Sequence, residues 1–359
     1  MFKRICAVIG IITLLCAFAG CGRPAAVSSS SEEAVVSSSS QESQPASSSS
    51  ASAESSGPAS KIESVTLTSK AIASNKLEER TERVLTVYLP ASYEAGDKAY
   101  PVVYYLHGFG DSERSFVGGA RRELDKLFAD GKGEFILVGV NGNNKSGGSF
   151  YVNSPVTGNF EDYVTQEVVD CIDGNYRTLA TPASRGICGF SMGGFGAIYL
   201  ALRHPDIYGA IYAMSPGIAK TSSFDTVLDS WKTDSMVMKA YGQAFAPDPD
   251  GESPFCILPK RDGTDADNAL LDKWVDGYAN WDKKLDDYLA KGTPLHGIGI
   301  SYGHSDYYRW IPEGCEYFIG LLKQNGIEPS VVAFEGGHVV PPSGVSNQLL
   351  PFFRDNLTF

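Results

Sequence analysis

The chain has 359 residues, of which 43% are hydrophobic and 20% charged, and its formal net charge at pH 7 is −12. The excess of acidic residues argues against nucleic acid and anionic lipid headgroups as partners, because both carry the same sign of charge. Without its first sixty residues the chain is long for one domain, but normal for an α/β fold that carries an inserted lid.

The N-terminus has the pattern of an export signal. Lys3 and Arg4 form a basic region, and residues 5–18 form an apolar stretch too short for a comfortable membrane span. The sequence Phe-Ala-Gly-Cys that ends at Cys21 resembles the cleavage box of bacterial lipoproteins. We therefore expect removal of residues 1–20, lipidation of Cys21 and a location at the extracellular face of a bacterial cell membrane. An ordinary secretory signal with an incidental cysteine is the alternative.

Residues 21–60 are predicted to form a disordered tether. Positions 28–60 contain 17 serines among 33 residues, with scattered glutamate, glutamine, proline and alanine. Such a segment cannot bury enough apolar surface to offset its chain entropy. A flexible chain of this length has a root-mean-square reach of roughly 35 Å, which would hold a folded domain clear of the membrane.

The folded region, residues 61–359, shows apolar segments in an alternating order of strand and helix. Strands are expected at 84–89, 101–106, 135–140, 186–188, 210–214, 296–302 and 330–334. Helices are expected at 121–130, 160–176 and 197–204. Continuous apolar strands between helices are typical of a parallel sheet covered on both faces. The pattern therefore predicts an α/β fold with a mostly parallel sheet.

Residues 216–294, which we call the lid, are too long for an ordinary connection. They contain two predicted helices, at 224–241 and 268–289, and a proline-rich passage at 247–259. Open α/β sheets bind ligands at the carboxyl ends of their strands, so we expect the lid to cover that edge. Its acidic residues Asp262, Asp265 and Asp267 lack the glycine and distal glutamate of a calcium loop, which favours helix capping and solvation.

Seven cysteines are present, and three of them lie at or before the predicted lipidation site. The other four, Cys171, Cys188, Cys256 and Cys315, lack the paired spacing of a zinc site, and no metal or organic cofactor is expected. Cys188 falls in a predicted core strand and is interpreted as a buried thiol. Export leaves a disulfide bridge among the others open.

The most informative segment is Gly189-Phe190-Ser191-Met192-Gly193. It lies between a short apolar strand and a run of helix-forming residues. A Gly-x-Ser-x-Gly turn in that context holds a serine hydroxyl at the tip of a sharp strand-to-helix turn. Side chains in place of Gly189 and Gly193 would collide in so tight a turn. Ser191 is therefore the predicted nucleophile, and a glycine-rich turn with an incidental serine is the alternative.

A serine nucleophile needs a base, and the base needs a carboxylate to orient it. His338 follows the last predicted strand and Asp306 follows the strand before it, so both belong at the sheet edge of Ser191. Their order along the chain, Ser, Asp and then His, is that of α/β hydrolases. His304 stays open as an alternative base, and capping of the next helix is an alternative role for Asp306. Glu335 is only three residues from His338 and is less able than Asp306 to reach behind its ring.

Two backbone N–H groups are expected to form the oxyanion hole. They belong to Met192, directly after the nucleophile, and to Phe109, in a glycine-rich loop after a predicted strand. His107 is expected to brace that loop. The side chains assigned to substrate binding are His107, Tyr151, Tyr302 and His304. Aromatic residues suited either to an aryl or sugar ring or to core and lid packing are Phe109, Phe150, Tyr151, Tyr302, Tyr307, Tyr308 and Trp310.

The chain resembles a known family in four segments, at 106–110, 189–194, 302–306 and 336–338. It is the esterase family of α/β hydrolases that includes feruloyl and acetyl-xylan esterases, S-formylglutathione hydrolase (esterase D) and mycolyltransferases. The resemblance extends from about residue 84 to residue 353 and implies an α/β-hydrolase fold. It also implies Ser191 as nucleophile, His338 as base and Asp306 as acid. The lid is longer than in compact feruloyl esterases, so the resemblance supports the chemistry better than the substrate.

We therefore expect a serine esterase that forms an acyl-enzyme and hydrolyses feruloyl or acetyl esters of polysaccharide. If the lid excludes water, transfer of the acyl group to an acceptor hydroxyl is the alternative within the same chemistry. A non-catalytic glycan-binding lipoprotein that retains the fold is an alternative of another class. A metal-dependent hydrolase using His304, Asp306 and His338 is a further one, but it would leave Ser191 unexplained.

Overall fold

The structure is a computed structural model, and it describes residues 59–359. The predicted signal peptide, the lipidation site Cys21 and nearly all of the predicted tether lie outside the described residues. Ser60, expected at the end of the tether, is buried, and Arg121 donates hydrogen bonds to its hydroxyl (3.0 Å) and its carbonyl. The folded part therefore includes Ser60. Within residues 59–359, no helix is both long and apolar enough to cross a membrane.

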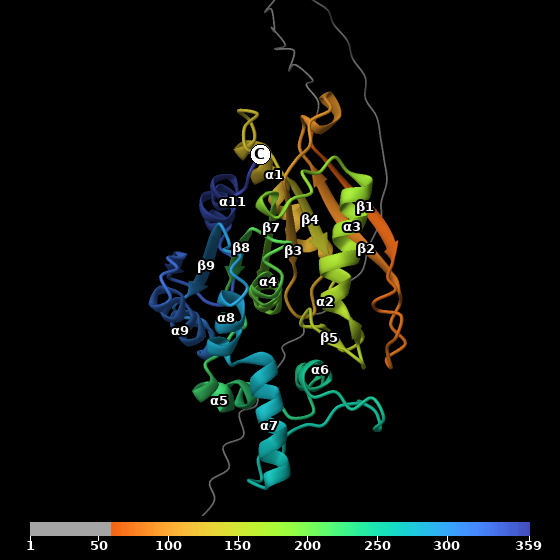
Figure 1. Ribbon diagram of the computed structural model, residues 1–359, viewed down its shortest axis with the longest axis vertical. Helices are drawn as coiled ribbons and strands as arrows, with labels where there is room; N and C mark the ends of the chain where they lie inside the picture. Colours follow the sequence, from red (N-terminus) through yellow and green to blue (C-terminus); the bar gives the residue numbers. More distant parts are fainter. Residues whose placement is uncertain (1–58) are drawn as a thin grey trace, which may run out of the picture. The chain divides into compact units, whose positions relative to one another are not determined.

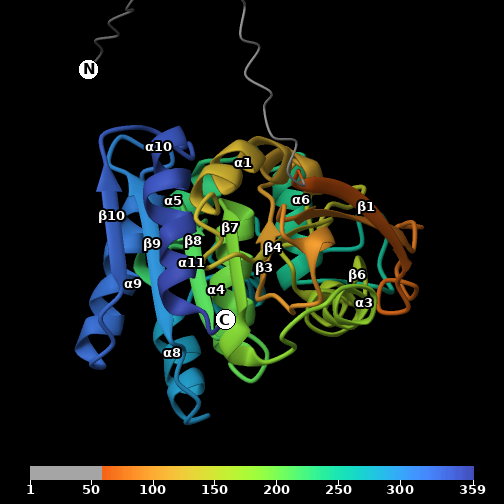
Figure 2. The same ribbon diagram turned by 90° about the horizontal axis from the view of Figure 1, so that it is seen from above.

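An eight-stranded sheet forms the centre of the fold, in the order β1-β2-β4-β3-β7-β8-β9-β10 (Figure 1, and from above in Figure 2). Its strands are β1 (Lys61–Thr68), β2 (Glu82–Leu89), β3 (Val102–Leu106), β4 (Ile136–Val140), β7 (Arg185–Phe190), β8 (Ala210–Met214), β9 (Gly297–Gly303) and β10 (Ser330–Phe334). β2 is antiparallel to both of its neighbours, and every pair from β4 to β10 is parallel. A second sheet pairs β5 (Asn153–Ser154) with β6 (Gly158–Asn159). The predicted α/β class with a mostly parallel sheet is therefore confirmed.

Helices cover both faces of the large sheet. On one face pack α1 (Glu113–Leu127) and α11 (Leu350–Asn356). On the other face lie α4 (Met192–Arg203), α9 (Trp310–Gln324) and a helical run of α2 (Phe160–Asp162), a π-helical turn (Tyr163–Val168) and α3 (Val169–Asn175). β3, β4 and β8 are buried along their whole length between these layers, which is why their sequences are continuously apolar.

Two differences from the predicted elements have local causes. The helix expected at 121–130 begins at Glu113, because Gly118 and Gly119 weaken the helical signal of its first turns. β1 has no counterpart among the predicted strands. It is an edge strand whose residues are all exposed or half-buried, and its apolar residues do not alternate regularly.

The lid contains more and shorter helices than expected, and α5, α6 and α7 lie together at the lower end of Figure 1. The helix expected at 224–241 is α5 (Phe224–Asp229) and α6 (Met236–Phe245). The helix expected at 268–289 is α7 (Asp265–Tyr278) and α8 (Trp281–Leu289), which are separated by Asn280 in a left-handed conformation with φ 51°. The hydroxyls of Ser235 and Thr264 cap α6 and α7. Asp267 accepts hydrogen bonds from the backbone N–H groups of Lys260 and Asp262 at 2.8 and 3.2 Å, so it holds the loop before α7, whereas the cap of α7 is Thr264.

α8 packs against the body of the protein, although the sequence places it in the lid. Its Trp281 is fully buried and contacts Phe195 of α4 and Phe318 of α9, with ring centroids 5.7 and 5.4 Å apart. The part of the lid that reaches the sheet edge therefore ends with α7.

The cysteines at positions 171, 188, 256 and 315 are free thiols in the described part of the chain. Cys188 is fully buried in β7, as expected, and burial raises the pKa of its thiol far above the usual value. A buried neutral thiol of this kind is a packing residue rather than a reactive one.

Candidate active site

Ser191 stands at the junction between β7 and α4, on a turn that depends on its glycine neighbours. Its own backbone is strained, with φ 56° and ψ −115°. A Cβ on Gly189 would lie 2.1 Å from the carbonyl oxygen of Gly193. A Cβ on Gly193 would lie 1.9 Å from the carbonyl oxygen of Leu106. Because both positions touch backbone, neither accepts a side chain without opening the turn.

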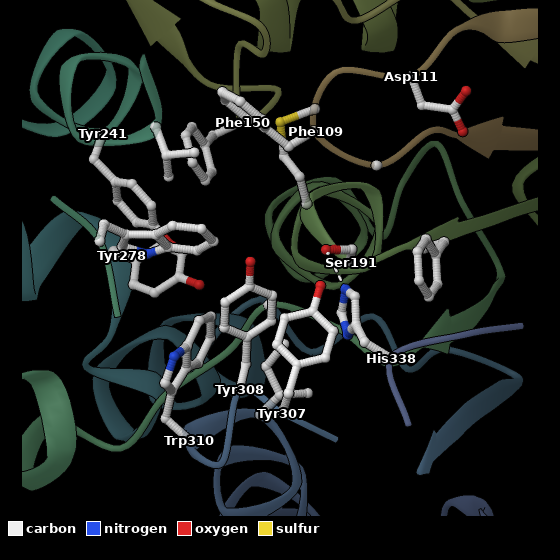
Figure 3. Close-up of a pocket in the computed structure, with 17 residues that line it drawn as sticks. Phe109, Asp111, Phe150, Ser191, Tyr241, Tyr278, Tyr307, Tyr308, Trp310 and His338 are labelled. Atoms are coloured by element: carbon white, nitrogen blue, oxygen red, sulfur yellow. Dashed lines mark hydrogen bonds between the residues drawn. The ribbon is translucent and has the colours of Figure 1, made fainter. Parts of the chain in front are cut away.

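Side chains that follow β7, β9 and β10 meet at this edge. Nε2 of His338 lies 2.9 Å from the Oγ of Ser191 (Figure 3), and its Nδ1 lies 2.7 Å from Oδ2 of Asp306. Asp306 is fully buried, and its other oxygen accepts a 2.9 Å hydrogen bond from the backbone N–H of Tyr308. With its ring proton on Nδ1, His338 donates to Asp306 and accepts from the Ser191 hydroxyl. The arrangement is suited to taking up the serine proton.

The loops that carry Asp306 and His338 are joined through their backbones. The N–H of Ser305 donates a 2.9 Å hydrogen bond to the carbonyl of Gly336. A Cβ on Gly303 would lie 2.4 Å from that same carbonyl oxygen, so the two loops touch where β9 and β10 end. The carboxylate and the imidazole are thus positioned by paired strand ends.

The two N–H groups expected to form the oxyanion hole flank Ser191. Met192 begins α4, and a Cβ on Gly108, next to Phe109, would lie 3.6 Å from the Cβ of Ser191. Among residues 59–359, neither the N–H of Met192 nor that of Phe109 has a backbone acceptor. Free N–H groups beside a nucleophile are what an oxyanion hole requires. The assignment of this role to Met192 and Phe109 stays a prediction.

His107 and Tyr151 brace the loop after β3, and both are fully buried. Nε2 of His107 accepts a 3.0 Å hydrogen bond from the N–H of Gly142, and the Tyr151 hydroxyl donates a 2.9 Å bond to the carbonyl of His107. Burial lowers the pKa of His107 and favours its neutral form. The bracing role expected for His107 is present, and neither side chain lines the cavity beside Ser191.

Tyr302 and His304 are also absent from the cavity beside Ser191, and their assignment to substrate binding stays a prediction. Tyr302 is buried within β9, and His304 is exposed at the surface of the following loop, with its ring 5.9 Å from that of Tyr302. The histidine in contact with Ser191 is His338 and not His304. No group of three or more His, Cys, Asp or Glu residues suited to a metal ion occurs in residues 59–359.

A cavity of about 280 Å³ adjoins Ser191, near the lower limit of roughly 300 Å³ for small-molecule pockets. Its wall is largely aromatic and is formed by Phe109, Phe150, Phe190, Trp231, Tyr241, Tyr278, Tyr307, Tyr308 and Trp310. Sequence reasoning missed Phe190, Trp231, Tyr241 and Tyr278. The last three belong to the lid, and the sequence of a lid does not show which face of each helix turns toward a cavity.

Residues 74–256 match the family described as putative esterase. The chain is 26% identical to S-formylglutathione hydrolase of Mus musculus, over 67% of this chain and 88% of that protein. It is 34% identical to an esterase of Mycobacterium tuberculosis, over 72% of this chain and 53% of that protein. It is 35% identical to an endo-1,4-beta-xylanase/feruloyl esterase of Xylanibacter ruminicola, over 36% of this chain and 19% of that protein. The chain thus spans about half and about a fifth of the length of the last two relatives.

Solved structures show the same fold. A ferulic acid esterase is similar with a TM-score of 0.57 at 23% identity, over 83% of this chain and 100% of that chain. A fluorophosphonate-binding serine hydrolase of Staphylococcus aureus is similar with a TM-score of 0.57 at 18% identity, over 84% of this chain and 100% of that chain. The predicted α/β-hydrolase fold is therefore confirmed. Since the family match covers half of the chain, this protein belongs to the putative esterase family, and the predicted enzyme class, carboxylic ester hydrolase, is the class of that family.

Proposed function

We propose that this protein is a serine esterase that hydrolyses carboxylic esters with Ser191, His338 and Asp306. One observation carries the proposal: a continuous series of contacts joins the Ser191 hydroxyl to His338 (2.9 Å) and His338 to Asp306 (2.7 Å) at the wall of a cavity. Membership of the esterase family supports ester hydrolysis as the reaction.

In the proposed mechanism, Nε2 of His338 removes the Ser191 proton as the serine oxygen attacks the ester carbonyl. Asp306 keeps the imidazole in the required orientation and stabilises the imidazolium. The N–H groups of Phe109 and Met192 bind the negatively charged oxygen of the tetrahedral intermediate. His338 then gives its proton to the leaving alcohol, and an acyl ester of Ser191 remains. Water that has lost a proton to His338 hydrolyses this ester and restores the serine.

We propose feruloyl or acetyl groups on polysaccharide as the substrates. Two of the similar proteins are named feruloyl or ferulic acid esterase. An aromatic wall suits a flat aryl ring, because such rings pack well edge to face or with an offset. A polysaccharide is too large for a cavity of about 280 Å³, so the sugar would stay outside while the acyl group enters.

We propose that the protein acts at the extracellular face of a bacterial membrane through lipid on Cys21. The basic and apolar N-terminal pattern that ends at this cysteine supports the location. Labelling of growing cells with a fatty-acid analogue should mark the full chain and leave Cys21→Ala unlabelled. An unlabelled wild-type chain, or a labelled variant, would contradict the anchor.

The catalytic proposal is tested with the full chain, its Ser191→Ala variant and His304→Ala as the matched control. On aryl acetates and methyl ferulate, Ser191→Ala should lose on the order of 10⁴-fold or more in kcat/KM. His304→Ala should keep wild-type activity, because His304 is exposed and outside the cavity. Equal inactivity of the wild type and Ser191→Ala would refute the proposal. Product analysis with a sugar acceptor present would show whether transfer competes with hydrolysis.

A further inference from the structure

Two tyrosines of the lid stand in the wall of the cavity on the side away from Asp111. Tyr241 of α6 and Tyr278 of α7 line the cavity and are only 3% and 1% exposed. Figure 3 shows both of them across the cavity from His338, with their rings directed inward. These residues lie outside the catalytic contacts, so the proposed mechanism does not use them.

The hydroxyls of this tyrosine pair have hydrogen-bonding capacity that the protein leaves free. Their rings meet edge to face with centroids 4.8 Å apart, so the two hydroxyls can share at most one hydrogen bond. A tyrosine hydroxyl has one proton and two lone pairs. Even with one bond within the pair, one proton and three lone pairs would stay free. Both residues line the cavity, so a ligand bound there can supply the further partners.

Glycine at position 217 keeps the space between the nucleophile and the tyrosine pair open. A Cβ on Gly217 would lie 3.1 Å from the Tyr278 hydroxyl and 3.5 Å from the backbone oxygen of Ser191. Gly217 itself lines the cavity. A ligand bound to Ser191 therefore meets no side chain at this position on its way toward Tyr278.

The surroundings make the pair suitable for recognising a hydroxyl group. Burial raises the pKa of both phenols far above the usual value, so both remain protonated and able to donate at neutral pH. Phe150, Val237 and Trp310 line the same cavity. A ligand that places an apolar group against the pair leaves desolvated hydroxyls without partners, which disfavours binding.

We propose that Tyr241 and Tyr278 determine specificity by hydrogen-bonding a ring hydroxyl of an aryl acyl group. The inference rests on the proposed esterase function, with the acyl carbonyl at Ser191 and the ring along the aromatic wall. The enzyme should then prefer hydroxycinnamoyl esters to cinnamoyl esters that lack the hydroxyl. An acetyl group ends near Ser191 and gains nothing from the tyrosines.

The test compares methyl p-coumarate with methyl cinnamate, which differ by one ring hydroxyl, and uses phenyl acetate as a general ester. The full-chain enzyme should prefer p-coumarate by about tenfold or more in kcat/KM. Tyr241→Phe and Tyr278→Phe should each lower that ratio about three- to tenfold, and the double variant should bring it close to one. The matched control is Tyr212→Phe, a buried tyrosine of β8 that does not line the cavity and whose hydroxyl has no partner among residues 59–359. It should keep the wild-type ratio.

The outcomes separate this inference from the proposed function. A wild-type enzyme that hydrolyses phenyl acetate and methyl cinnamate but shows no preference for p-coumarate overturns the inference alone. An unchanged preference for p-coumarate in both tyrosine variants overturns the inference too, because another group then binds the ring hydroxyl. Inactivity on all three esters defeats the proposed function, and the inference with it. Calorimetric titration of Ser191→Ala with p-coumarate and cinnamate, with and without Tyr278→Phe, should give the same ordering without turnover.

Discussion

Two sides of the cavity are built in different ways. One is the catalytic edge, with Ser191, Asp306 and His338, and the other is the wall that the lid forms. At the edge, backbone contacts set the positions: Gly193 has no room for a Cβ, and Ser305 bonds to Gly336 across two strand ends. In the wall that the lid forms, rings from separate helices pack on one another, as Tyr241 of α6 does on Tyr278 of α7 with centroids 4.8 Å apart. Damage to the edge should therefore lower activity on every ester, whereas damage to the wall should change which ester is preferred.

The largest effect is expected at the buried acid. In Asp306→Asn the amide no longer favours the Nδ1 proton on His338, so kcat should fall on the order of 10⁴-fold. Phenyl acetate and methyl ferulate should be affected equally, because the acid does not contact the acyl group. Circular dichroism should show an intact fold. A loss below tenfold, or a loss on one ester alone, would contradict the assignment of Asp306.

Gly193→Ala changes the same edge through a collision with the backbone. The new Cβ would lie 1.9 Å from the carbonyl oxygen of Leu106, so the turn between β7 and α4 must open. We expect a loss of about 1–3 kcal/mol in the free energy of unfolding. Displacement of the nucleophile by about 1 Å should cost roughly 10²-fold in kcat/KM on all esters. Chemical denaturation and steady-state kinetics measure the two effects.

Gly118→Ala is the matched control for that substitution. Gly118 lies inside α1, and its Cβ would have no neighbour within 4 Å. Alanine there should stabilise the protein by about 0.5–1 kcal/mol without changing kinetics. If both alanine variants had the same stability and the same kinetics, the steric explanation of the turn at Ser191 would be wrong.

A smaller and more selective kinetic effect is expected from Phe150→Ala, which changes the cavity wall beside the lid. Phe150 is 3% exposed and packs on Phe195 of α4 as well as on Tyr241, so it joins the lid to the body. Its loss should lower the free energy of unfolding by about 3–5 kcal/mol. The kcat/KM for methyl ferulate should fall by about tenfold more than that for phenyl acetate, since an acetyl group does not use this wall. Phe359→Ala, at a position that is 50% exposed, should change neither quantity.

Short-range patterns were sufficient to predict the catalytic edge. The apolar runs at 210–214 and 330–334 coincide with β8 and β10, and their order places Ser191, Asp306 and His338 at one edge. Parallel strands bring their carboxyl ends together whatever the lid does. Gly189 and Gly193 were identifiable because the need for glycine there comes from steric crowding within the turn itself.

The residues around the substrate could not be assigned in that way. His107 and Tyr151 lie near the motifs along the chain, yet one ring accepts a backbone N–H and the other supports the loop from inside the core. Tyr241 and Tyr278 carry no motif, and their place in the wall depends on how α6 and α7 pack. That packing is a sum of many weak contacts among distant residues, which a pattern in one stretch of sequence does not contain.

The smallest expected effect tests how far the lid and the edge are coupled. The Nε1 of Trp310, at the start of α9, donates a 3.0 Å hydrogen bond to the hydroxyl of Ser230 in the lid. Ser230→Ala removes the acceptor and should cost about 0.5–1.5 kcal/mol in unfolding, with the exposed Ser222→Ala as control. The KM for methyl ferulate should rise about twofold, because Trp310 lines the cavity, and kcat for phenyl acetate should not change. A fall in that kcat would show that a contact of the lid affects the catalytic residues. The claim that the lid sets only the preference among esters would then be wrong.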